Sequence, residues 1–504
     1  MSDKTEFFAA IDLGSNSFHA VIARNVGEPA SSNLMVVDRH KESVRLAAGL
    51  DGNDVLSEET QASALACLDR FKQLLNQIPP SHIRAVGTNT LRRAGNGNDF
   101  LQRAEAALGV PIDIISGLEE ARLIYQGVSH DLGDAPDRRL VVDIGGGSTE
   151  FIHGLGETPL MMDSLQIGCV RLTQQYFRDK VITQETMNKA LTDVRHELAP
   201  VKRRWRKAKW DIAIGASGTA QAIGQVLAEL HITDGTLTAD GLETLADICV
   251  AAGNSDALNF SCLSSDRSLV FPAGVAAMLS IFRTLKIKQM QPVETALREG
   301  VLQDLSGSSN YAEIRQRSVE QLAQRHHLDL EHGLRVERTA ERILAKLAAD
   351  WEIDVGSYSP LLHWAGRLHE IGLSIGHKNY HQHGAYILRN SNLPAFSHRD
   401  QESIALLILA QRKRFPVESF ESSQVHSAKR LLQLQKLAAV LRIAIILHRT
   451  RNPDRVPEVA AIIKEGDLCL TFPSAWLESH PMVSHDLLQE KSKLLAAGIT
   501  LRFE

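Results

Sequence analysis

The sequence lacks the cysteine patterns that hold small extracellular domains or zinc ribbons together. Only five cysteines occur in 504 residues, and no two of them have a C-x-x-C spacing. A disulfide framework and a zinc ribbon are both poorly supported, and reduced thiols are the simplest interpretation. We therefore expect a cytoplasmic protein.

An excess of positive charge is also absent. Lys and Arg number 55 against 60 Asp and Glu, which gives a formal net charge of -5. This balance argues against a protein that binds nucleic acid through its overall charge, and no nucleic-acid partner is expected. A polyanionic ligand would have to be held by local cationic pockets.

Neither a secretory signal nor a membrane span is predicted. The first ten residues, MSDKTEFFAA, have no basic segment followed by a long apolar core. No apolar run approaches the roughly 18 residues needed to cross a bilayer. With 44% apolar and 23% charged residues, the composition is typical of a globular protein, and the length predicts roughly three to four domains.

Two segments of the chain share one pattern. AAIDLGSNSFHAVIA and LVVDIGGGSTEFIHG both contain an apolar strand, an Asp, an apolar residue, a Gly, two small residues, a Ser and a second strand. Asp12 and Asp143 occupy the same place in the two copies. The repeat predicts two similarly folded domains that face each other.

The remaining sequence shows where the domains divide. Residues 57–78 have helical spacing behind a Ser57 cap, IRAVGT predicts a strand, and the polar residues 131–139 predict a linker. From about residue 310 helices dominate. They are expected over residues 314–328, 334–351 and 359–373, and a strand pair with a Gly-Asp turn is expected over residues 460–472.

The two repeated turns have the composition of phosphate-binding loops. Their backbone N–H groups can point towards one anion, glycine permits close approach, and an Asp at the strand end supplies a hard oxygen for Mg²⁺. Hairpin turns chosen for backbone geometry alone are the alternative, but two such loops in one chain favour phosphate binding. The residues assigned are Asp12, Gly14, Ser15, Asn16, Gly145, Gly146, Gly147 and Ser148.

A third loop, in IAIGASGTAQAIG, joins a predicted strand to a predicted helix. Free N–H groups at the start of a helix attract anions, so we assign Gly215, Ser217 and Gly218 to phosphate binding as well. An ordinary strand-to-helix turn is the alternative.

The segment IDIISGLEEARLIYQGV contains the candidate catalytic residue. Ser116 and Glu119 fit a capping box at the start of a helix. Glu120 points about 100° away around that helix, where it can orient and deprotonate the water that attacks phosphorus. A solvated helix-face Glu is the alternative.

A pair of arginines adds positive charge. Arg92 and Arg93, in GTNTLRRA, follow a predicted strand and are suited to forked contact with phosphate oxygens. We expect at least one of them to be a surface cation.

Six motifs in this order resemble the exopolyphosphatase and guanosine pentaphosphate phosphohydrolase (Ppx/GppA) family. They are AAIDLGSNSFH, GTNTLRRA, ISGLEEARLIYQGV, VVDIGGGSTE, IGASGT and ALREGVL. The resemblance implies two actin-like, ribonuclease-H-like domains with the active site in the cleft between them. It also implies that Glu120 is the catalytic base, that Arg92 and the first Asp-Gly loop belong to the phosphate site, and that Asp143 is associated with Mg²⁺. We add Glu150 as a second metal residue.

The helical part resembles a metal-dependent phosphohydrolase of the histidine-aspartate (HD) type but departs from it. His332 and His369 stand where ligands would be, whereas Glu370 and Ile445 replace two expected aspartates. Because Ile cannot ligate a metal, no working dinuclear site is expected. We expect this part to extend a groove for a long anionic substrate and to support a homodimer.

The predicted fold is α/β: two actin-like domains, a helical HD-like domain and a small mixed C-terminal domain. The expected boundaries are residues 1–128, 129–306, 310–432 and 433–504.

The leading interpretation of function is an exopolyphosphatase that removes the terminal phosphate of inorganic polyphosphate. Hydrolysis of guanosine pentaphosphate (pppGpp) to the tetraphosphate (ppGpp) keeps the same chemistry and is left open. A kinase or ATPase on the same scaffold and a non-catalytic sensor are the alternatives from other classes.

Overall fold

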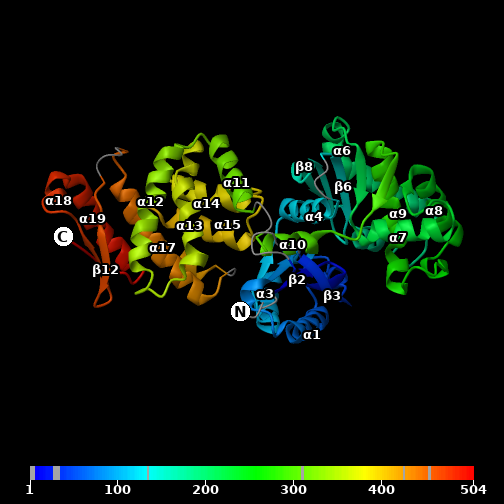
Figure 1. The fold of residues 1–504 in the computed structure, drawn as a ribbon, viewed down its shortest axis with the longest axis horizontal. Coiled ribbons are helices and arrows are strands. Elements are labelled where there is room, and N and C mark those ends of the chain that lie inside the picture. The colour runs from blue at the N-terminus through cyan, green and yellow to red at the C-terminus, as the bar shows by residue number, and fades with distance from the viewer. Residues whose placement is uncertain (1–5, 27–33, 133–135, 308–310, 424–425, 452–455) are drawn as a thin grey trace. The chain divides into compact units, whose positions relative to one another are not determined.

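The computed structural model describes residues 6–26, 34–132, 136–307, 311–423, 426–451 and 456–504. The chain forms two compact units, of which the first ends at Tyr311 and the second begins at Ala312. Both helices and strands build the protein (Figure 1), so the expected α/β composition is confirmed. We describe each unit by itself.

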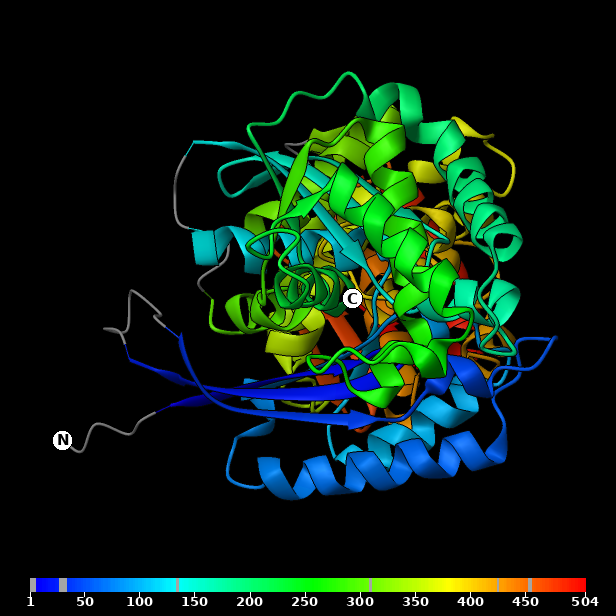
Figure 2. The same cartoon turned by 90° about the vertical axis from the view of Figure 1, so that its right-hand side faces the viewer.

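The first sheet of unit 1 has the strand order β3-β2-β1-β4-β5. Its strands are β1 (Phe7–Leu13), β2 (Ser17–Asn25), β3 (Leu34–Ser43), β4 (Ile83–Gly87) and β5 (Ile112–Ile114). Helices α1 (Glu58–Leu75) and α3 (Gly97–Leu108) cover one face, as Figure 2 shows for α1. The predicted Ser57 cap is confirmed, because its side chain accepts a hydrogen bond from the Thr60 N–H.

The second sheet of unit 1 has the order β10-β11-β9-β6-β7-β8. Its strands are β6 (Arg138–Ile144), β7 (Thr149–Leu155), β8 (Thr158–Leu165), β9 (Ile212–Gly215), β10 (Leu237–Thr238) and β11 (Gln289–Pro292). Its helices are α5 (Cys169–Tyr176), α6 (Gln184–Trp205), α7 (Gly218–Glu229), α8 (Ala239–Ala252) and α9 (Ser265–Leu285).

The predicted repeat is confirmed by the pairing of these strands. In both sheets an antiparallel three-strand meander (β1–β3, β6–β8) continues into parallel neighbours. Asp12 lies opposite His19 in β2, and Asp143 lies opposite Glu150 in β7. The two aspartates therefore occupy equivalent positions in two copies of one motif.

One expectation about apolar segments was wrong. Helix α9 is long and apolar enough to cross a membrane by length and composition, although 83% of its apolar window is buried. Its side chains pack against α6, α7 and α8 in the core beside the second sheet. A core helix of a globular domain meets the same criterion as a membrane span.

Two helices each pack on the sheet that they do not follow in sequence. Helix α4 (Gly117–Leu132) follows the first sheet in sequence but packs on β7 and β8 of the second. Helix α10 (Leu297–Leu305) follows the second sheet and packs on β1 and β4 of the first. The two helices cross at Gly127 and Gly300, where a Cβ on Gly300 would lie 1.9 Å from the Leu123 carbonyl oxygen. Only glycine allows this approach.

The predicted linker is shorter than expected. Helix α4 extends to Leu132 and β6 begins at Arg138, while residues 133–135 lie outside the described residues. The expected boundary at 128/129 falls inside α4.

Unit 2 combines helices with a three-stranded sheet, β12-β13-β14, in one hydrophobic core. The helices and strands are α11 (Tyr311–Arg325), α12 (Leu330–Leu347), α13 (Val355–Leu368), α14 (Tyr380–Asn390), α15 (His398–Ala410), α16 (Val417–Glu421), α17 (Ala428–Leu447), β12 (Ala460–Lys464), β13 (Asp467–Thr471), α18 (Trp476–Ser479), α19 (Pro481–Leu495) and β14 (Leu501–Phe503). The expected boundary at 432/433 falls inside α17, whose side chains share the core with β12 and β13.

The predicted helices and strand pair of this part are present. The turn between β12 and β13 is made by Glu465 and Gly466, both with positive φ, rather than by the expected Gly-Asp pair.

The α4–α10 crossing generates a stability prediction. Gly300→Ala places a Cβ against rigid backbone, so we expect the free energy of unfolding to fall by about 3 kcal/mol despite the better helix propensity of Ala. Chemical denaturation followed by circular dichroism measures the loss. Gly52→Ala is the matched control, because a Cβ there meets no atom within 4 Å. Equal stability of the two variants would contradict the crossing.

Candidate phosphate-binding site

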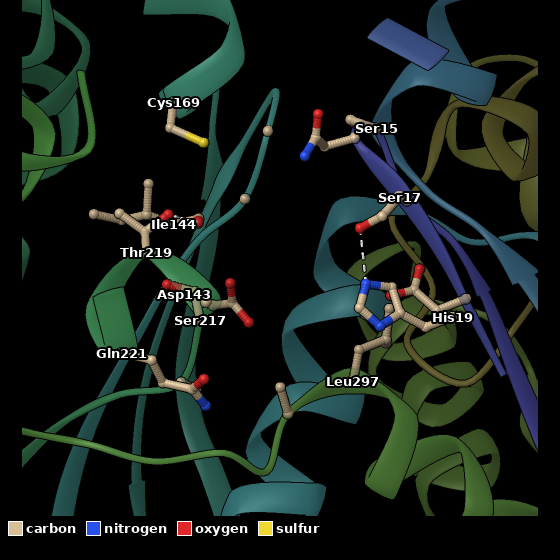
Figure 3. A pocket seen from close by; sticks show the side chains of 18 of the residues that line it. Ser15, Ser17, His19, Asp143, Ile144, Cys169, Ser217, Thr219, Gln221 and Leu297 are labelled. Atoms are coloured by element: carbon tan, nitrogen blue, oxygen red, sulfur yellow. Dashed lines mark hydrogen bonds between the residues drawn. The ribbon is translucent and has the colours of Figure 1, made fainter. Parts of the chain in front are cut away.

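A cavity of about 640 Å³ lies between the two sheets of unit 1. Figure 3 shows Ser15, Ser17 and His19 on one wall and Asp143, Ser217 and Thr219 on the facing wall. The assigned residues that line it are Asp12, Gly14, Ser15, Asn16, Glu120, Asp143, Gly145, Gly146, Gly147, Ser148, Ser217 and Gly218. Segments far apart in sequence thus converge on one cavity.

The repeated turns meet across this cavity because their glycines carry no side chain. A Cβ on Gly147 would lie 2.5 Å from the Oδ1 of Asn89, and one on Gly146 would lie 2.9 Å from the Cβ of Ser15. The turn of the second copy is closed by the Gly145 N–H, which donates to the Ser148 carbonyl oxygen at 2.9 Å. The glycines are therefore required by close approach as well as by turn geometry.

Four buried carboxylates influence one another in and behind the cavity. Burial raises the pKa of Asp12 to about 7, with Arg298 opposing the shift and Glu120 adding to it. Burial raises the pKa of Asp143 to about 8, and the negative charges of Glu120 and Asp12 add to the shift. Burial and the charges of Glu120 and Asp143 also raise the pKa of Glu150. The site therefore concentrates negative charge that a cation would relieve.

This carboxylate set fits Mg²⁺. The Oδ1 of Asp12 is buried without a hydrogen-bond partner, and all the donors are hard oxygens of the type Mg²⁺ prefers. Within the described residues, no three of these carboxylates bring ligand atoms within 4.8 Å of one another. A Mg²⁺ site here would therefore use one or two carboxylates and complete its shell with water and phosphate oxygens.

Glu120 reaches the cavity from the first turn of α4. Its Oε2 accepts a hydrogen bond from the Nη1 of Arg92 at 3.0 Å, and Arg92 also donates to the Ile115 carbonyl oxygen at 2.6 Å. Burial raises the pKa of Glu120, while Arg92 lowers it by its charge and its hydrogen bond. Arg92, on α2 (Asn89–Arg93), does not line the cavity. It orients Glu120, and its assigned contact with phosphate remains a prediction.

Arg93 lies further out. Its Nη2 donates to the Oδ1 of Asp54 at 2.6 Å, and 43% of its side chain is exposed. One of the two arginines is therefore a surface cation, as predicted.

The predicted capping box at Ser116 is only half present. The Ser116 hydroxyl accepts from the Glu119 N–H at 3.1 Å, but the Glu119 carboxylate binds the Arg122 guanidinium with two bonds of 2.8 Å. Arg122 also donates to Asp304 on α10. Because these charges are all buried, Glu119, Arg122 and Asp304 together join α4 to α10.

Besides Arg92, two more assigned residues lie outside the cavity lining. Glu150 is buried beside it and accepts a hydrogen bond from Ser164 at 2.8 Å. Gly215 lies at the end of β9, where a Cβ would come within 2.6 Å of the Ala220 Cβ. Gly215 thus permits strand–helix packing. Ser217 both lines the cavity and caps α7, accepting from the Ala220 N–H.

The prediction missed the positive side of the cavity. Arg39, Lys41, Arg267 and Arg298 all line it. Burial and the nearby charges of Arg267 and Arg298 lower the pKa of Lys41, which is typical of cations gathered to hold an anion. Arg298 lies within the motif ALREGVL and could have been identified from it, whereas the others lie in segments with no recognisable pattern.

His19 orients Arg298. Its Nδ1 accepts a hydrogen bond from the Arg298 guanidinium, and its Nε2 is paired with the Ser17 hydroxyl at 2.8 Å. Burial and the charge of Arg298 lower the pKa of His19 to about 3. The ring is therefore neutral at pH 7, and its Nδ1 can accept a hydrogen bond from Arg298.

In unit 2, His332, His369 and Glu370 place ligand atoms within 4.8 Å of one another. Arg451 binds Glu370 at 2.6 Å and Asp329 at 3.2 Å. The guanidinium already supplies a positive charge to this cluster, and the structure does not test whether it holds a metal.

Comparison with known proteins places these features in a family. A model of the Ppx/GppA phosphatase family matches residues 21–309, and a model of its domain III matches residues 314–491. An exopolyphosphatase from Cytophaga hutchinsonii has 23% identity over 60% of this chain and 98% of its own, with a TM-score of 0.55. A Ppx/GppA family member from Aquifex aeolicus has 25% identity over 61% and 99%, with a TM-score of 0.50. The first of these similarities shows the fold alone.

The carboxylate cluster generates a prediction about metal binding. Asp143→Asn removes one negative charge, so in chelator we expect the free energy of unfolding to rise by about 1 kcal/mol. Saturating Mg²⁺ should then raise the melting temperature of the variant less than that of the wild type, since a ligand is lost. Asp247→Asn, an exposed change on α8, is the control. An equal response of Asp143→Asn and the wild type to Mg²⁺ would exclude Asp143 as a ligand.

Proposed function

We propose that this chain, which belongs to the Ppx/GppA phosphatase family, hydrolyses the terminal phosphoanhydride bond of inorganic polyphosphate. The observation that carries the proposal is the convergence of Glu120, two equivalent aspartates and four cations on one cavity. The carboxylates suit water activation and a metal, and the cations suit a substrate with many negative charges.

The chain's own groups have distinct roles in this reaction. Backbone N–H groups at Gly14–Asn16 and Gly146–Ser148 bind the terminal phosphate, and Arg298 offsets its charge. Glu120, held by Arg92, orients a water molecule and takes its proton during in-line attack. Mg²⁺, held by Asp143 with Asp12 or Glu150, would supply Lewis-acid stabilisation of the phosphate oxygens when bound.

The composition of the cavity favours a phosphate chain. None of the described residues that line it is Phe, Tyr or Trp, so a nucleobase would find none of these large rings on which to stack. Arg39, Lys41 and Arg267 instead offer charge beyond the terminal phosphate. These cations suit the successive phosphates of an extended chain.

A second substrate, guanosine pentaphosphate, is favoured by one other feature. Helix α7 and the segment before α9 contribute uncharged side chains, among them Gln221, Gln225 and Leu263. Side-chain amides can hydrogen-bond a base edge. This wall could accommodate a nucleoside while its phosphates occupy the cationic wall.

Replacement of Glu120 tests the assigned base. Glu120→Gln keeps the shape of the side chain but cannot accept the proton from water. We expect kcat for phosphate release from polyphosphate to fall about 10²- to 10⁴-fold, with KM changed little. Glu59→Gln, an exposed change on α1, should retain wild-type kcat. Comparable turnover by Glu120→Gln would remove Glu120 from its role.

Direct competition between substrates decides between polyphosphate and guanosine pentaphosphate. Both are supplied to the purified full chain at equal concentration of cleavable ends, with Mg²⁺, and products are separated by chromatography. We expect polyphosphate to be consumed first, because no Phe, Tyr or Trp among the described lining residues offers a base a large ring for stacking. Preferential conversion of pppGpp to ppGpp would reverse the assignment without altering the chemistry.

A further inference from the structure

A second cavity, of about 280 Å³, lies on the other side of the glycine turns. It is lined by Ala47, Leu50, Asp51, Asp54, Asn89, Thr90, Arg93, Gly146, Gly147, Arg171, Gln174 and Gln175. Asn89, Gly146 and Gly147 also line the first cavity. Asp51, Gln174 and Gln175 are exposed, so the second cavity has its own rim at the protein surface.

The wall between the two cavities is thin. It consists of the backbone of Gly146 and Gly147. This backbone contacts Ser15 and Asn89, which belong to the part of unit 1 built on the first sheet, and no side chain lies between them. The amide nitrogen of Asn89 makes only a long hydrogen bond, 3.4 Å, to Gln166. The Thr90 hydroxyl donates to that of Ser15 at 2.8 Å. A rotation of the Asn89 side chain is therefore opposed by little hydrogen-bond energy.

The proposed reaction creates a geometric problem that this wall could solve. In the proposed binding mode the terminal phosphate lies at the glycine turns, and the rest of the chain extends along Arg39, Lys41 and Arg267, which line the same cavity. After cleavage, the water oxygen is bonded to the released orthophosphate, and the bridging oxygen stays with the shortened chain. The orthophosphate is then enclosed behind that chain. It can leave by the first cavity only if the chain leaves before it.

We propose that the second cavity is the exit for the orthophosphate product, reached past Asn89 while the shortened polyphosphate stays bound. This inference rests on the proposed function. Orthophosphate is small and needs only a narrow passage, whereas the chain is retained by cations that the second cavity does not match.

The charges of the second cavity suit passage rather than retention. Arg93 is paired with Asp54 at 2.6 Å, and Arg171 is paired with Asp193 at 3.1 Å. Each guanidinium offers an anion a partly balanced positive charge. Arg39 of the first cavity is likewise paired, with Glu299 at 2.7 Å, so the difference between the cavities is one of number: Arg93 and Arg171 line the second, whereas four cations line the first. A dianion should therefore be held less tightly in the second cavity.

A bulky side chain at the rim of the second cavity tests the proposed exit. Gln174→Trp introduces a large ring at an exposed position of α5 beside the cavity, so the fold should be preserved. With long-chain polyphosphate and Mg²⁺, we expect the single-turnover rate to remain at the wild-type value, because the chemistry is untouched. The steady-state rate should fall at least tenfold, and chains of intermediate length should accumulate on gels as each chain leaves to free the phosphate.

A second variant and a control complete the experiment. Gln175→Trp approaches the cavity from the neighbouring position and should act in the same direction, while Gln73→Trp, exposed on α1, should behave as the wild type. Wild-type steady-state rates and length distributions in both rim variants would overturn the exit. A wild-type enzyme that releases the chain after every cleavage would also overturn it. Absence of phosphate release from the wild type would instead contradict the proposed function.

Discussion

The crossing of α4 and α10 is the contact on which the geometry of the site depends. Helix α4 packs on the second sheet and helix α10 on the first. Gly127 and Gly300 let the backbones of the two helices touch. The buried pair of Arg122 and Asp304 fixes one helix against the other. Because Glu120 lies on α4 and Arg298 on α10, this crossing sets the distance between the proposed catalytic base and a cation of the proposed phosphate site.

Burial gives the carboxylate cluster its chemical character. Asp12 and Asp143 come from equivalent strands, and burial raises the pKa of both. The charge of Asp12 adds to the shift of Asp143, and the charge of Asp143 adds to that of Glu150 beside the cavity. Such a cluster destabilises the metal-free protein, which is the usual cost of a preorganised site. A divalent cation would offset the negative charge of the carboxylates. A polyanionic substrate would offset the positive charge of the cations that line the same cavity.

The sequence predicts features whose cause is local. The Asp-Gly turns follow from strand alternation and turn chemistry, so both loops and the equivalence of Asp12 and Asp143 could be found in advance. Features with distant causes could not. The Glu119 carboxylate satisfies a local capping pattern but pairs with Arg122, which Asp304 also binds, 182 residues further along. Lys41 and Arg267 lie in sequence segments with no recognisable pattern. They form one group of cations only in the fold, where both line the cavity between the two sheets.

The proposed enzyme is a hydrolase that uses Mg²⁺, acts on a phosphate chain and needs no nucleotide. Orthophosphate release from long-chain polyphosphate by the purified full chain, followed continuously with Mg²⁺ and then with excess chelator, tests this most directly. Release should proceed with Mg²⁺, stop on chelation and resume when Mg²⁺ is restored. No release under any condition, or release that the chelator leaves unchanged, would contradict the account.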